Sequence, residues 1–178
     1  RRPEPALRLR ARAYLALAAG APESSATARE EYNGLAAHSA QTLLLYYPGD
    51  PHGYLLLAEA RLGEGNTEQA EAALNRLLAI DDPTFREQHA DVLRLAYQRR
   101  GELYWQQGRV ALAGQDLRRA EQPGTVDRLL ALDLTEGEYD DAALQLTTLL
   151  NRNDEQSPAY RLVGARLAVQ VCRYSALD

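Results

Sequence analysis

The feature that most constrains the fold is a pattern that recurs three times along the chain. Gly65, Gly108 and Gly137 each head one copy. Alanine follows each glycine after five residues, leucine after nine, and a third apolar residue after twelve. Offsets that differ by four and three place these positions on one stripe of an α-helix. The stripes are Ala70, Leu74 and Leu77; Ala113, Leu117 and Ala120; and Ala142, Leu146 and Leu149.

A second set of positions recurs before each glycine. Aromatic or apolar residues stand eleven residues upstream, and small or apolar residues stand seven upstream. These are Tyr54, Tyr97 and Val126, followed by Ala58, Gly101 and Leu130. A degenerate earlier copy is centred on Ala36, Ala40 and Leu43, and a partial fourth copy begins at Tyr160. Each unit is therefore expected to be a helix, a tight turn at glycine, and a second helix.

Composition and helix-start signals support an all-α chain. The 178 residues include 31 Leu and 30 Ala, whereas Val, Ile and Thr together supply only 15. Leu and Ala favour helices, and β-branched residues favour strands. Asp-Pro or Ser-Pro pairs at residues 50–51, 82–83 and 157–158 are typical of a capping residue followed by the first helical position. We expect helices near 4–19, 23–47, 51–63, 67–80, 83–107, 109–121, 125–136, 138–152 and 158–173, with Asn33-Gly34 as a place where the second can split.

These recurring residues resemble the tetratricopeptide repeat (TPR). The best match has an aromatic residue, a small residue, a glycine turn and the buried stripe: Tyr97, Gly101, Tyr104, Gly108, Ala113, Leu117 and Ala120. The resemblance implies a right-handed α-solenoid of stacked helix-turn-helix repeats in one domain, 1–178. Residues 1–50 would be degenerate or capping helices, 51–84, 85–122 and 123–156 repeats, and 157–178 a partial repeat. Gly65 and Gly108 are 43 residues apart, which suggests about nine extra residues that lengthen the helix over 85–107.

No pattern in the sequence indicates catalysis, a metal site or a cofactor. His38, His52 and His89 are far apart and lack the spacing of metal ligands. Adjacent acidic pairs at 81–82 and 140–141 point in different directions on a helix, so capping and solvation explain them better than acid–base chemistry. Cys172 is the only cysteine and has no partner that its position suggests. We therefore expect a protein that is not an enzyme and binds no cofactor.

The charge distribution argues against nucleic acid as the partner. Net charge is −5, and residues 101–150 hold nine acidic residues against four Arg. Nucleic-acid binding depends on neutralising phosphates with Lys and Arg. No apolar run approaches the ~20 residues of a membrane span. The 20 Arg without any Lys suggest a GC-rich, bacterial genome. The missing initiator Met fits a cleaved secretory protein and equally an excised domain, so the compartment stays open between bacterial cytoplasm and periplasm, with association with the cell envelope weakly favoured.

The resemblance implies a protein-interaction module whose first helices line a concave groove. The candidate partner-binding residues are Leu55, Glu59, Gln98, Glu102, Trp105, Gln106, Asp127 and Arg161. Trp105 directly follows Tyr104, so both cannot enter the same stripe; Trp105 either faces the groove or seals contact with the elongated neighbouring repeat. Acidic residues in the groove favour a partner peptide or protein with basic residues.

The wider role expected is part of a bacterial scaffold or of an assembly or secretion factor. One alternative is a structural module that assembles with copies of itself through its ends. An RNA-binding helical repeat is a weaker alternative, because the middle of the chain is acidic.

Overall fold

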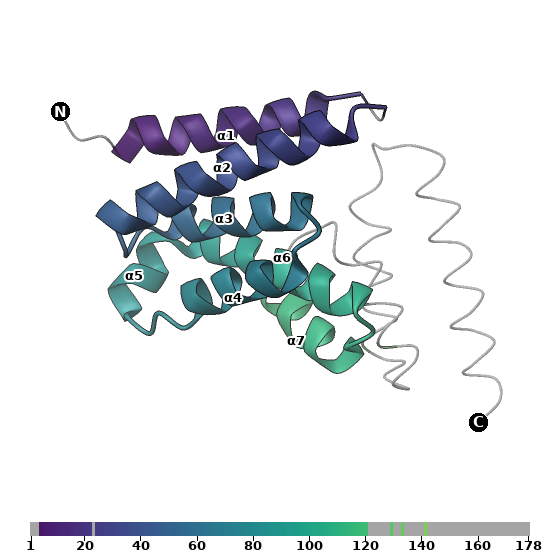
Figure 1. Cartoon of the computed structure of the whole chain (residues 1–178). Coiled ribbons are helices and arrows are strands. Elements are labelled where there is room, and N and C mark those ends of the chain that lie inside the picture. Colours follow the sequence, from purple (N-terminus) through teal and green to yellow (C-terminus); the bar gives the residue numbers. More distant parts are fainter. Residues whose placement is uncertain (1–3, 23, 121–128, 130–132, 134–140, 142–178) are drawn as a thin grey trace, which may run out of the picture.

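The computed structural model describes residues 4–22, 24–120, 129, 133 and 141, and all regular structure among them is α-helical. The helices are α1 (Glu4–Gly20), α2 (Ala26–Tyr46), α3 (Pro51–Gly63), α4 (Thr67–Leu78), α5 (Pro83–Gln88), α6 (Ala90–Gln106) and α7 (Val110–Ala120). Figure 1 shows three hairpins, α1–α2, α3–α4 and α6–α7, stacked one on the next. The structure confirms an all-α helical-repeat solenoid. The helices expected over 125–136, 138–152 and 158–173 lie outside the described residues.

The recurring stripe forms the contact surface of each second helix. Its members in the first three hairpins are Ala36, Ala40 and Leu43; Ala70, Leu74 and Leu77; and Ala113, Leu117 and Ala120. All nine are 0% exposed. The predicted stripe is confirmed for α2, α4 and α7, and the copy at 142–149 lies outside the described residues.

Close approach within a hairpin depends on the small residue of its first helix. A Cβ atom on Gly101 of α6 would lie 2.9 Å from the side chain of Leu117 and 3.3 Å from the carbonyl oxygen of Ala113. Contacts this short would force α6 and α7 apart. The residue seven positions before the glycine turn is therefore small because α7 lies directly on it.

The glycine turns end the first helices as expected. Gly65 and Gly108 have φ angles of 75° and 72°, in the left-handed region where a side chain is strained. Asn66 N–H donates to the Arg61 carbonyl at 2.8 Å, and Arg109 N–H donates to the Tyr104 carbonyl at 2.8 Å. These hydrogen bonds close each helix with the same C-terminal motif.

The long helix expected over 83–107 is wrong, because the chain breaks at His89 into α5 and α6. His89 has φ −119° and ψ 24°, and its ring packs edge-on against Phe85 with the ring centroids 4.7 Å apart. The break lets α5 fold back so that Phe85 packs against the central core cluster. Neither Gly nor Pro marks this position, so the sequence carries no signal for it. The split suggested at Asn33-Gly34 is also wrong, since α2 is continuous there.

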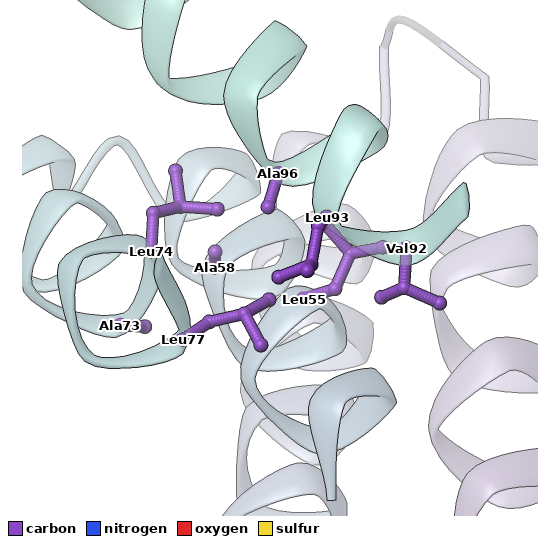
Figure 2. Packing of buried hydrophobic residues seen from close by; sticks show 8 residues of the cluster. All are labelled: Leu55, Ala58, Ala73, Leu74, Leu77, Val92, Leu93 and Ala96. Carbon is purple, nitrogen blue, oxygen red and sulfur yellow. The ribbon is translucent and has the colours of Figure 1, made fainter. Parts of the chain in front are cut away.

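The largest core cluster joins the second hairpin to the start of α6. Figure 2 shows Leu74 and Leu77 of α4 packed with Leu55 of α3 and with Val92 and Leu93 of α6. Burial of such side chains contributes about 1.5–3 kcal/mol each. This cluster fixes how α6 lies against α3, and hence which polar residues of these two first helices meet. Among the described residues no helix is long and apolar enough to cross a membrane.

Candidate functional site

The face shared by α3 and α6 brings together three of the predicted site residues. Arg99 of α6 lies between the two carboxylates, with Nη2 3.3 Å from Oε1 of Glu59 and Nη1 3.3 Å from Oε2 of Glu102. Gln98 donates from Nε2 to Oε1 of Glu102 at 3.0 Å. The side chains of Glu59, Arg99 and Glu102 stay between 24% and 39% exposed, so a partner can reach them. We call Glu59, Gln98, Arg99 and Glu102 the α3–α6 polar row.

Arg99 is the residue that sequence reasoning missed. It stands three residues before Glu102, a spacing that places the two side chains on one helix face. That spacing was available in the sequence, but the bond to Glu59 depends on how α3 and α6 lie against each other. The α3–α6 polar row is therefore less acidic than expected, with two carboxylates against one guanidinium.

Trp105 combines an internal contact with partial exposure. Its ring is partly buried against Leu117 and Leu129, whereas Gln106 beside it is exposed. Tyr104 is buried, as the packing pattern predicts. The contact with Leu117 and Leu129 agrees with a packing role for Trp105, and its exposed part continues the surface of the α3–α6 polar row.

Leu55 does not face the groove. Its side chain is buried in the central core cluster, under Val92 and Leu93 at the start of α6. These two residues belong to the segment that lengthens this repeat, so the extra residues cover the position that would otherwise be open. Asp127 and Arg161 lie outside the described residues.

A cationic region borders the N-terminal end of this face. Arg8 of α1 donates from Nε to Oδ2 of Asp50 at 2.7 Å, and Asp50 caps α3 by accepting from the backbone N–H of His52 at 2.9 Å. Burial lowers the pKa of His52, and the charges of Arg8 and Arg12 lower it further. Arg12 is exposed and follows the small residue Ala11, the same place that Glu59 and Glu102 hold in α3 and α6. Arg8 also pairs with Glu4 at 2.6 Å, so the positive charge that this part of α1 presents comes mainly from Arg12.

The opposite side of α6 carries a buried charged cluster. Arg100 forms two hydrogen bonds with Asp116 of α7, at 2.6 and 2.8 Å, and a third with Asn75 of α4 at 2.6 Å. Burial on its own lowers the pKa of Arg100, but the hydrogen bond and charge of Asp116 outweigh it, so the pKa is raised. The guanidinium also lies 5.7 Å from the centroid of the Tyr104 ring. This cluster joins three helices and leaves little surface for a ligand.

Within the described part of the chain, no group of three or more His, Cys, Asp or Glu side chains is arranged to hold a metal ion. The α3–α6 polar row itself offers charged and hydrogen-bonding groups next to one aromatic ring.

The stacked hairpins, with small residues inside and a polar face on the first helices, define a helical-repeat protein. Family models described as tetratricopeptide repeat match residues 33–93 and 95–122, so the chain belongs to the tetratricopeptide repeat family. Repeats of this family generally mediate protein–protein interactions. No curated protein and no solved structure matches the chain.

Proposed function

We propose that this chain is a non-catalytic module that binds a peptide or protein segment along its first helices, as part of a scaffold or of an assembly factor. The observation that supports this most is the α3–α6 polar row. Its charged side chains come from different hairpins, meet at distances of 3.3 Å, and remain partly exposed. The charged groups of the Arg100 cluster, by contrast, are enclosed by three helices.

The chemistry of the surface suggests a partner with both apolar and charged side chains. The exposed part of Trp105 offers apolar contact, and aromatic residues are common hot spots of binding. A basic side chain of the partner can share Glu59 or Glu102 with Arg99. An acidic one is better placed near Arg12, where α1 is cationic. Charge complementarity of this kind acts mainly on association rate and specificity.

The test begins with peptides selected from a random display library on the full chain. Affinities of the selected peptides are then compared between the native protein and its variants by fluorescence anisotropy. Glu102→Arg should weaken binding of peptides that carry basic residues, by about tenfold, since it places two like charges together. Trp105→Ala should weaken binding by roughly 2 kcal/mol, as truncation of hot spots does.

Two controls separate binding from folding. Glu68→Arg makes the same charge reversal at an exposed position in the first turn of α4, and should leave affinity unchanged. Thermal unfolding followed by circular dichroism shows whether Trp105→Ala also costs stability, because the ring contacts Leu117 and Leu129. If Glu102→Arg and Glu68→Arg affect every selected peptide equally, the α3–α6 polar row is not the binding surface.

A further inference from the structure

The outer face of α1 is apolar and lies uncovered in the described structure. Leu9 is 69% exposed and Leu17 50% exposed. Ala6, Ala13 and Ala16 are also exposed and lie on the same side of the helix, since Ala6, Leu9, Ala13 and Ala16 follow one another at spacings of three or four residues. We call these five residues the α1 stripe. Terminal repeats of a solenoid usually need a polar outer face for solubility, so an apolar one points to an occupant.

Residues of the α1 stripe hold the same places in α1 as residues of α3 that contact the preceding hairpin. The small residues Ala11 and Ala58 hold equivalent places, since Ala11 packs with Ala40 of α2 and Ala58 packs with Leu74 of α4. Counting from them, Leu9 corresponds to Leu56 of α3, and Ala13 to Ala60.

In α3 these two positions pack on the preceding hairpin. Leu56 contacts Ala11 and Ala40, and Ala60 contacts Ala36 and Ala37. The α1 stripe thus repeats the surface by which one hairpin stacks on another.

Arg10 shows what the occupant should offer besides apolar contact. It corresponds to Arg100 of α6, which bonds Asp116 of its own hairpin and Asn75 of the preceding one. Arg10 donates from Nε to Oγ of Ser39 at 3.0 Å, and Ser39 precedes Ala40 as Asp116 precedes Leu117. No described residue holds the place that Asn75 has for Arg100, so Arg10 is left with a single neutral acceptor.

We propose that the α1 stripe docks a helical hairpin of a partner protein, which lays its second helix on α1 as α2 lies against α3 and as α4 lies against α6. The internal contact defines the chemistry of that helix. It carries a leucine, a hydrogen-bond acceptor directly after it, and a second leucine three residues after the first, as Leu74, Asn75 and Leu77 do in α4. The acceptor would bond Arg10.

A second copy of this chain is a poorer occupant for two reasons. Self-pairing through α1 would bring Arg10 and Arg12 of one copy toward those of the other, and like charges at close range disfavour contact. Among the described helices, the stripes of α2, α4 and α7 are already fully buried within the chain, so none of these three is free to serve as the docking helix.

The experiment uses the hairpin of the chain itself as a probe. A second copy of residues 49–82 is fused to the N-terminus of the full chain through a flexible Gly/Ser linker. The linker makes docking intramolecular, so the probe is present at a high effective concentration. Docking should raise the melting temperature of the full chain by about 5 °C. Leu9→Glu should abolish this rise, whereas in the chain without the probe it should shift melting by about 1 °C or less, because Leu9 is mostly exposed.

A charge exchange tests the role of Arg10. Asn75→Lys in the probe copy alone should reduce the rise, and Arg10→Glu in the full chain should restore it. Leu74→Asp in the probe copy is the matched control, and no change in the full chain should rescue it.

Three results would overturn the proposal. The first is that the probe produces no rise in melting temperature, and the second is that the rise persists with Leu9→Glu. The third is self-association of the unfused chain that Leu9→Glu abolishes in sedimentation velocity, which would make a second copy the occupant. None of these variants touches the α3–α6 polar row, so this test and the peptide-binding test fail independently.

Discussion

Arg99 and Arg100 are neighbours in the sequence but serve opposite faces of α6. Arg99 bridges Glu59 and Glu102 through contacts of 3.3 Å, and its side chain is 39% exposed. Arg100 bonds Asp116 at 2.6 Å, and these two side chains are only 16% and 3% exposed. Residue type and charge are identical, so the difference comes from what surrounds each guanidinium. The enclosed ion pair joins the packed helices, and the partly exposed one is the pair that we propose for recognition.

The largest loss in the free energy of unfolding is expected for Asp116→Ala, which removes the partner of Arg100. It leaves the Arg100 guanidinium enclosed without its carboxylate, and breaking a buried pair in this way costs about 3–5 kcal/mol. Urea denaturation should show the loss in the free energy of unfolding. Asp91→Ala is the matched control, because Asp91 pairs with Arg94 on the exposed side of α6 and such pairs contribute about 0–1 kcal/mol. A loss below about 1 kcal/mol for Asp116→Ala would mean that the Arg100 cluster does not fix the packing of α6.

An intermediate effect is expected for Asp50→Ala, whose carboxylate is almost fully buried. Asp50 caps α3 and also accepts from Arg8 of α1, so its loss removes both a cap and a link between hairpins. We expect a destabilisation of about 2 kcal/mol, of which the cap supplies about 1 kcal/mol. Asp82→Ala is the control, because Asp82 caps α5 through Thr84 and Phe85 at an exposed site. Equal losses for both variants would show that the bond to Arg8 adds nothing to the cap.

A small effect on stability is expected for Arg99→Ala. Its two ion pairs are partly exposed, and pairs of this kind contribute about 0–1 kcal/mol, less at high salt. The free energy of unfolding should therefore fall by less than about 1 kcal/mol, measured in urea at low and at high salt. Peptides selected on the native chain should nonetheless bind the variant differently, since Glu59 and Glu102 lose their shared cation. A loss above about 2 kcal/mol would assign Arg99 a structural role like that of Arg100.

The two sides of α6 also show which features can be predicted from the sequence. The buried stripes of α2, α4 and α7 were predictable because the spacing of apolar residues along one helix determines its buried face. The position of Tyr104 followed from the same local rule. Such features need no knowledge of how distant segments meet.

The features that the sequence did not predict depend on contacts between hairpins. The bond from Arg99 to Glu59 joins residues 40 positions apart and follows from the packing of α6 on α3. Leu55 is covered by Val92 and Leu93 because the chain breaks at His89. No Gly or Pro is present there to predict a break. An extra segment could lengthen a helix or fold back, and only the packing of Phe85 on the core decides between them.

The smallest effect is expected for His52, which lies in the first turn of α3 near Arg8 and Arg12. Burial lowers its pKa in the folded state, Arg8, Arg12 and His89 lower it further, and Asp50 alone raises it. As pH falls below about 6.5, the unfolded chain takes up a proton at this residue before the folded chain does. The contribution of neutral His52 to stability is therefore complete above the unfolded pKa and is lost as pH falls through the folded pKa.

Urea denaturation of the native chain and of His52→Gln between pH 8 and pH 5 should show the native chain losing more stability toward low pH. All other side chains are the same in both proteins, so the difference between the two curves reports on position 52. If the two curves stay parallel, or if the native chain gains stability as pH falls, burial and the charges of Arg8 and Arg12 do not lower the pKa of His52 in the folded chain.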